Sequence, residues 1–490
     1  MMNARRVFCW ILVVLTWAGS LYGQNPRQQE KRYLPYATRI AQAESRLPSV
    51  AGAQRASLLD SLCRLYWLQA ELYGEMWRAS TIVLRTYLEF SDSINTLDPV
   101  YTMHLGMIYV EGGDGQKAVK ALQKAIQMRG VSPANAAVAK AWLGAAHVLE
   151  GSKEKGRAAW DECGKASPDV RFEARFLAAR FDPEWYKRAG RAVASGNQSR
   201  RVQRSLAYIA CVAGDLTTAR KLSSTLDPAL PLYVEKKGTL EERSLYDPAM
   251  LAVMHRVAIE LCGSYAEELN TLPGASSEQK AASLLYMGMV SYERGDWQRS
   301  IFQLRASSDA NARAYLAAAL VHAGNRAEAE REIQLCLGSS GPEAWSTLSA
   351  LLVRADVQEY HRHALAAAQK AVDAVLEAKK KDHRVPQQFF SNLGLACETV
   401  GLMEDALVAY HRGWNAAKAS DLVANDPVFL VRHATCYVTA LHLRQLSTAI
   451  GLMSHMRDVY PESKAIAEPM NSLNTLTNAT IDNEVKLKVH

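Results

Sequence analysis

The most conspicuous candidate metal ligands in this sequence are two histidines, His361 and His363, that lie two residues apart. Imidazole is a common metal ligand. The surrounding pattern is helical, however, and residues two apart on a helix do not share a face. A chelating pair on a helix needs a spacing of three or four residues. The sequence therefore predicts no metal site here.

A second candidate is the stretch from 171 to 204, which is rich in arginine and also carries the aromatic residues Phe181, Trp185 and Tyr186. A basic surface of this kind could bind an anionic partner, such as an acidic protein face, lipid head groups or a polyanionic glycan. The alternative is a solvated face on which arginine stems cover apolar surface, and we favour it. The residues of this basic patch are Arg171, Arg175, Lys187, Arg188, Arg191, Arg200, Arg201 and Arg204.

Catalytic motifs are absent from the sequence. It contains no Gly-x-Ser-x-Gly turn, no phosphate-binding P-loop and no His-Glu-x-x-His helix. Carboxylates are abundant, but solvated helix surfaces account for them. We therefore predict that the protein is not an enzyme and carries no cofactor and no metal.

The first 23 residues have the pattern of a secretory signal peptide. Arg5 and Arg6 precede a short apolar run, and small residues follow it at Gly19 and Ser20. A retained anchor and a twin-arginine export signal are the alternatives. Removal of two arginines would lower the formal net charge of +7 by two, and so mild a charge indicates no nucleic-acid partner.

Cysteine usage argues against a disulfide framework. The chain has eight cysteines, and cleavage after the signal would remove Cys9 and leave an odd number. Four of the others, Cys163, Cys336, Cys397 and Cys436, stand among apolar residues at helical spacing. We interpret these four as core residues.

The repeating unit of the chain is a pair of helices that meet at a glycine, seen most clearly from Gln387 to Trp414. Apolar residues recur at the helical period before Gly401 and again after it. Gly394 and Ala406 supply small residues on the packing faces, which lets two antiparallel helices lie close together. A hairpin of about 34 residues cannot bury its apolar face alone, so stacked copies are expected.

Copies of this hairpin recur along the chain. In each clear copy a pair such as Leu105-Gly106 precedes a pair such as Gly113-Asp114 and then an alanine such as Ala118. The clear copies begin near Pro99, Ala137, Ala281 and Gln387, weaker ones begin near Arg201, Ala310 and Leu430, and a degenerate one runs from Leu58 to Leu88 with its turn at Gly74.

This pattern resembles the tetratricopeptide repeat family over about two thirds of the chain. The resemblance implies an all-α fold, a right-handed α-solenoid of helix hairpins, and a role in binding other proteins. The chain departs from the family where the first helix often carries tryptophan, since Thr102, Lys140, Leu284 and Phe390 stand there.

Composition divides the array in two. Pro228, Pro231 and the Lys236-Lys237-Gly238 run indicate a break between two subarrays. We predict a signal peptide at 1–23, an N-terminal array at 24–234, an irregular connecting segment at 235–277, a C-terminal array at 278–468 and a polar tail at 469–490.

In the resembling family, the first helix of each hairpin lines a concave face that holds a partner. The corresponding residues here are largely apolar, which favours burial of an apolar anchor over a charge clamp. The equal alternative is that these residues belong to the core of the protein itself. They are Val100, Met103, Met107, Trp142, Leu285, Tyr286, Met289, Tyr292 and Tyr315.

These features together suggest a non-catalytic scaffold that binds other proteins of the bacterial cell envelope, as in a secretion or outer-membrane assembly. The envelope role is an analogy with exported bacterial proteins that resemble this one. We expect an exported protein, periplasmic or associated with the outer membrane, with no transmembrane span after signal cleavage and no nucleic-acid partner; its oligomeric state stays open. One alternative is an exported binding protein for a peptide or anionic glycan, and another is an enzyme with its site in the irregular segments.

Overall fold

The computed structural model describes residues 36–94, 99–188, 199–226, 229–236, 239–379 and 387–402, with a few more between 405 and 412. The predicted signal peptide, the hairpin expected near Leu430 and the polar tail lie outside these residues. Within them, no helix combines the length and apolar character that crossing a membrane would require.

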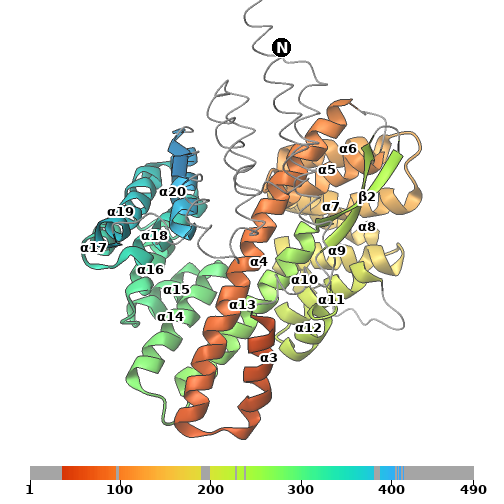
Figure 1. Ribbon diagram of the computed structural model, residues 1–490. Helices are drawn as coiled ribbons and strands as arrows, with labels where there is room; N and C mark the ends of the chain where they lie inside the picture. Colours follow the sequence, from red (N-terminus) through yellow and green to blue (C-terminus); the bar gives the residue numbers. More distant parts are fainter. Residues whose placement is uncertain are drawn as a thin grey trace, which may run out of the picture. The chain divides into compact units, whose positions relative to one another are not determined.

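Helices make up nearly all of the described chain, as the hairpin pattern predicts (Figure 1). The early helices are α3 (Ala37–Arg46), α4 (Gly52–Ile94), α5 (Pro99–Glu111), α6 (Gly115–Gln127), α7 (Pro133–Leu149), α8 (Lys153–Cys163), α9 (Pro168–Phe181), α10 (Pro183–Arg188), α11 (Arg200–Val212) and α12 (Leu216–Ser223). After the strands β1 (Ala229–Lys236) and β2 (Thr239–Tyr246) come α13 (Pro248–Thr271), α14 (Ser277–Glu293), α15 (Trp297–Arg305), α16 (Ala310–His322), α17 (Arg326–Ser339), α18 (Pro342–Ala355), α19 (His361–Lys379) and α20 (Gln387–Thr399). Two short 3-10 turns, Leu47–Ser49 and Gln358–Tyr360, complete the order.

Six hairpin turns share one backbone design. Each places a glycine at positive φ, between 73° and 90°, where a Cβ atom would be strained. The residue after the glycine then donates its N–H to the carbonyl five residues earlier, at 2.8–3.0 Å, which satisfies the end of the first helix. The glycines are Gly113, Gly151, Gly214, Gly295, Gly324 and Gly401.

The second helix of three of these hairpins starts on an aspartate cap. The side chains of Asp114, Asp215 and Asp296 each accept a hydrogen bond from the backbone N–H three residues on, at 3.1–3.2 Å. The Gly-Asp pairs seen in the sequence therefore end one helix and begin the next.

A second glycine sets how closely the two helices of a hairpin pack. A Cβ atom on Gly106 would lie 2.5 Å from Leu122 Cγ, and one on Gly288 would lie 2.5 Å from Leu304 Cγ. Gly144 faces the indole of Trp160 in the same way. In all three hairpins the partner lies sixteen residues later, so a single spacing positions the helix contact. Gly106 therefore has in its hairpin the close-packing role that the sequence predicts for the corresponding Gly394.

The described chain forms two compact units. One comprises Ala70–Ala258, and the other joins the segment up to Gln69 with the chain from Ile259. The division falls inside α4 and inside α13. The domain boundaries that we predicted from composition stay a prediction.

In the first unit, the hairpins α5/α6, α7/α8 and α11/α12 follow the predicted pattern, and α9 packs between α7 and α11. The predicted turn at Gly74 is wrong, because α4 continues through it as one helix of 43 residues. Gly74 serves close packing instead: a Cβ atom there would lie 3.0 Å from His255 Nδ1. That imidazole is hydrogen-bonded to the carbonyl of Ala70, at 2.7 Å.

The segment that we interpreted as a break contains a β-hairpin, which is a correction to the sequence analysis. Strands β1 and β2 pair antiparallel from Ala229 opposite Tyr246 to Lys236 opposite Thr239. Pro231 within β1 argues against a strand. The two-residue connection that ends in Gly238 is, in contrast, a common hairpin signal.

In the second unit, α14/α15 and α16/α17 are regular hairpins, and α20 begins the hairpin near Gln387. The stretch from 340 to 385, which fits no repeat in the sequence, holds a further pair, α18/α19, in contact with each other. Asp356 ends α18 with a φ of 51° in place of the usual glycine. The family pattern misses this hairpin because its turn lacks that glycine.

Candidate functional site

The nine apolar residues predicted to hold a partner do not form one site. Val100, Met103, Met107 and Trp142 lie in the first unit and the other five in the second. Six are buried, with at most 6% of the residue exposed: Met103, Trp142, Leu285, Met289, Tyr292 and Tyr315. Met107 and Tyr286 are half-buried, and Val100 is 37% exposed. Partner binding by these residues stays a prediction, and their burial favours the core alternative.

Trp142 leads to the strongest polar feature of the first unit. Its indole Nε1 donates to Glu173 Oε1 at 2.8 Å, and both residues are fully buried. Arg204 Nη2 lies 2.6 Å from both carboxylate oxygens of Glu173, and Arg204 Nη1 lies 3.3 Å from Asp247. The site therefore links α7, α9 and α11 through one buried carboxylate.

The electrostatics of Glu173 follow from its two arginine neighbours. Burial by itself raises the pKa of Glu173, but Arg204 and then Arg201 outweigh burial and hold the pKa below its usual value of 4.5. The carboxylate is charged at neutral pH, so it has no proton to give as a general acid, and both of its oxygens are bound by Arg204. Its geometry serves helix packing.

A second buried ion pair lies in the same unit. Arg180 binds both carboxylate oxygens of Glu111, at 2.6 and 2.9 Å, and Glu111 also accepts from Trp77 Nε1 at 3.0 Å. The ring of Phe176 is within 5.2 Å of the Arg180 guanidinium and 4.9 Å of the Arg204 guanidinium. Cation–π contacts thus connect the two ion pairs.

The predicted basic patch is divided by the fold. Arg204 is buried, whereas Arg171 and Lys187 are exposed and Arg175, Arg200 and Arg201 are half-buried. Arg191 and the side chain of Arg188 lie outside the described residues. Three guanidinium nitrogens on α11, Arg200 Nη2, Arg201 Nη1 and Arg204 Nε, are enclosed and have no hydrogen-bond acceptor among the described residues.

Sequence reasoning missed the acidic partners of this region. Glu111 and Glu173 sit at helix positions that look like ordinary surface carboxylates. The available signal was their neighbours, because Glu173 stands among apolar residues such as Phe172, Ala174 and Phe176. A single charge inside an apolar helix face indicates a buried pair.

The second unit holds an aromatic cluster around Tyr292. Its hydroxyl is hydrogen-bonded to His322 Nε2 at 3.1 Å, and the His322 ring stacks on Trp297 with 4.2 Å between centroids. Burial lowers the pKa of His322, and Arg354 lowers it further. Burial raises the pKa of Tyr292. Both groups are neutral near pH 7 and pack as a stable polar core.

The histidine pair noted in the sequence does not converge. His361 Nε2 lies 3.5 Å from Asp356, and His363 Nε2 lies 3.1 Å from Glu330. Among the described residues, no three histidine, cysteine, aspartate or glutamate side chains are placed to hold a metal ion together.

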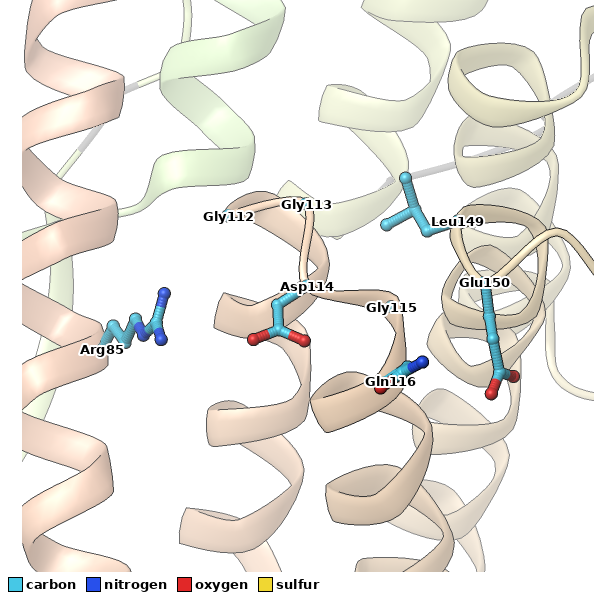
Figure 2. Close-up of a pocket in the computed structure, with 8 residues that line it drawn as sticks. All are labelled: Arg85, Gly112, Gly113, Asp114, Gly115, Gln116, Leu149 and Glu150. Atoms are coloured by element: carbon cyan, nitrogen blue, oxygen red, sulfur yellow. The ribbon is translucent and has the colours of Figure 1, made fainter. Parts of the chain in front are cut away.

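An open polar pocket of about 530 Å³ lies where the first turn meets α7 (Figure 2). Its charged groups are Arg85 from α4, Asp114 at the turn and Glu150 at the end of α7. Asp114 already caps α6 and pairs with Lys117 at 3.3 Å. The charged groups of the pocket therefore mostly interact with other groups of this protein. They do not form a set of catalytic groups.

The described residues define the class of this protein as an all-α solenoid of helix hairpins that resemble tetratricopeptide repeats, with a β-hairpin, β1/β2, between α12 and α13. No family model matches the chain, and no curated protein matches it.

Solved structures that match include the APC/C hetero-tetramer Cut9–Hcn1, which is 12% identical with a TM-score of 0.28, covering 94% of this chain and 98% of that chain. Yeast Tom70 is 11% identical with a TM-score of 0.28, covering 88% of this chain and 97% of that chain. Scores this low carry no argument, so the class rests on the shared turns and glycine contacts described above.

Proposed function

We propose that this chain is a non-catalytic scaffold that binds another protein of the cell envelope through the outer face of its second-unit hairpins. The observation that carries the proposal is Phe302 on α15, whose side chain is 74% exposed. Leu335 on α17, in the next hairpin, is 42% exposed. Aromatic residues are frequent anchors of protein interfaces.

The repeat itself provides an internal comparison for Phe302. Counting seven residues from each turn glycine gives one position per hairpin, and this position is exposed in all six hairpins. The residues there are Lys120, Ala158, Lys221, Phe302, Arg331 and Val408. Four hairpins thus place a polar or small residue on this solvated face, and the two large apolar residues both belong to the second unit.

A photo-crosslinking amino acid at position 302 in intact cells tests this proposal. We expect one protein to be captured from position 302 and not from position 221, which is the matched exposed position in the first unit. Phe302→Asp should abolish capture from a neighbouring crosslinking position such as 305, with the melting temperature unchanged because the side chain contributes little to the core. Equal capture from 302 and 221, or capture unaffected by Phe302→Asp, would refute the interface.

Export to the envelope is supported by the N-terminal sequence alone, in which Arg5 and Arg6 precede a short apolar run. On this basis we propose a periplasmic or outer-membrane-associated setting for the scaffold. The location is tested by fractionation together with the mature N-terminus, which is treated in the Discussion.

A second candidate function is binding of an anionic ligand at the basic patch. The enclosed, unpaired guanidinium nitrogens of Arg200, Arg201 and Arg204 favour it, because a buried donor without an acceptor is costly. Polyglutamate binding at two salt concentrations tests it. Binding that weakens in Arg201→Gln but not in the control Lys221→Gln, and that falls with salt, supports the ligand site. Equal binding by both variants would exclude it.

A further inference from the structure

Two buried cysteines face each other in the second unit, although they are far apart in the sequence. Cys262 Sγ, on α13, lies 3.4 Å from the carbonyl oxygen of Cys63, on α4. Cys63 Sγ in turn lies 3.9 Å from the carbonyl oxygen of Cys262. Both residues are 0% exposed, and both thiols are free. Each sulfur thus reaches the backbone of the opposite cysteine.

Flanking contacts fix this register. Arg55, before Cys63 on α4, pairs with Glu268, after Cys262 on α13, with Nε to Oε1 at 2.7 Å. The two helix segments therefore run antiparallel. On the other side of Cys63, the ring of Tyr66 stacks on Tyr265 with 5.7 Å between centroids.

A shared acceptor strengthens that stack. The hydroxyls of Tyr66 and Tyr265 both donate to Glu44 Oε1, at 2.7 and 2.8 Å. The ion pair and the tyrosine stack therefore both tie α4 to α13 near the two cysteines.

Cys262 also affects the protonation of Cys63. The hydrogen bond between the Cys63 thiol and the Cys262 side chain, followed by burial, raises the pKa of Cys63 well above its usual value. A protonated thiol is a poor nucleophile. Within the folded protein the pair is therefore inert, and any linkage forms while the two helices assemble or when they open.

We propose that Cys63 and Cys262 form a disulfide bond that ties α4 to α13 when the chain folds under oxidising conditions. The proposal goes beyond the scaffold function and does not depend on it. The oxidant is a small disulfide such as oxidised glutathione. One cysteine thiolate attacks the glutathione disulfide, giving a mixed disulfide and one glutathione thiolate. The second cysteine then displaces the other glutathione. The two cysteine thiol protons pass to the two glutathione thiolates, so the two cysteines are oxidised and one glutathione disulfide is reduced to two glutathione molecules.

The other described cysteines provide the matched controls. Cys211 on α11 is equally buried, and its thiol donates to the carbonyl of Arg256 at 3.8 Å. Cys163, Cys336 and Cys397 lie in α8, α17 and α20. A cross-link specific to Cys63 and Cys262 therefore distinguishes this geometry from general oxidation.

Peptide mapping by mass spectrometry tests the proposal on the full chain, refolded in oxidised and reduced glutathione, trapped by alkylation and digested without reduction. We expect the peptides of Cys63 and Cys262 to be joined in most molecules, and Cys211 to be alkylated. Free or singly glutathionylated Cys63 and Cys262 in most molecules would overturn the proposal, and so would random pairing among all cysteines.

A second measurement covers variants. Addition of dithiothreitol should lower the melting temperature of the oxidised wild-type protein and of Cys211→Ser by the same amount. In Cys63→Ser it should have no effect. An equal fall in Cys63→Ser would show that reduction acts elsewhere, and no fall in the wild type would show that no stabilising bond exists. If Cys63→Ser does not fold, the mapping of the wild-type protein decides alone.

Discussion

Replacement of Gly288 by alanine tests whether the glycine contact sets the helix spacing. The added methyl group would lie 2.5 Å from Leu304 Cγ and 2.6 Å from Leu304 Cδ2. Carbon atoms in contact normally stand about 3.5–4.0 Å apart. Leu304 is 1% exposed, so it cannot turn into solvent. The helices α14 and α15 would have to separate by about an ångström.

The magnitude follows from two opposing effects. Overpacking a full core costs roughly 1–3 kcal/mol, and we expect the upper half because the clash involves Cγ, the branch point of the side chain. Alanine favours a helix over glycine by about 1 kcal/mol. Gly288→Ala should therefore lower the free energy of unfolding by about 1–2 kcal/mol.

Gly338 on α17 is the matched control. It belongs to the same compact unit, and an added Cβ atom there would meet nothing within 4 Å. Gly338→Ala should raise the free energy of unfolding by about 0.5–1 kcal/mol. The two variants should therefore differ by about 1.5–3 kcal/mol, a difference in which the helix preference of alanine largely cancels.

Urea unfolding followed by far-ultraviolet circular dichroism measures both variants in the transition of the second unit. If the free energies of unfolding of Gly288→Ala and Gly338→Ala agree within about 0.5 kcal/mol, the close contact does not set the helix spacing. An unchanged m-value in both is required, because a change would indicate that the unfolding reaction itself differs.

Four further predictions concern the first unit and the N-terminus. Glu173→Gln should destabilise the protein by about 3–5 kcal/mol, because it removes the charge that the buried Arg204 binds at 2.6 Å and leaves only Asp247, at 3.3 Å; denaturant unfolding checks this. Since the folded pKa of Glu173 is depressed, its contribution should be complete above pH 4.5 and fall as pH drops through the lower folded value, which a pH series of melting temperatures tests. Trp142→Ala should cost about 3–5 kcal/mol, and unchanged melting would contradict its burial. The mature N-terminus should begin between Leu21 and Asn25, whereas an intact Met1 found by mass spectrometry would contradict export.

The turns were predictable because one local rule determines them. A residue at positive φ between two helices is nearly always glycine, and the aspartate after it caps the next helix. The pairs Gly113-Asp114 and Gly295-Asp296 therefore identify their turns from the sequence, without any knowledge of tertiary contacts. The close contact between the two helices of a hairpin also has a local signal, which is a glycine sixteen positions before a large residue. Gly106 and Leu122 are an example.

Features that depend on distant partners were not predictable. Gly74 carries the same residue type as a turn glycine, but it lies in the interior of α4 because the His255 ring, from far along the chain, occupies the space of its missing side chain. The approach of Cys63 to Cys262 likewise spans 199 residues. No local pattern encodes which two helices will meet.

The apolar residues of the first helices illustrate why a helical pattern alone does not identify a binding surface. Trp142 and Tyr315 follow the spacing expected of a groove, yet both are buried in the protein itself. Periodicity reports which face of a helix avoids water, and a neighbouring helix satisfies that requirement as well as a partner does. Exposure at a repeat position is the better criterion, because the other hairpins show what an unoccupied position holds. Phe302 meets that criterion where Lys120 and Lys221 mark ordinary solvated surface. Partner binding should therefore depend on Phe302 and not on Trp142.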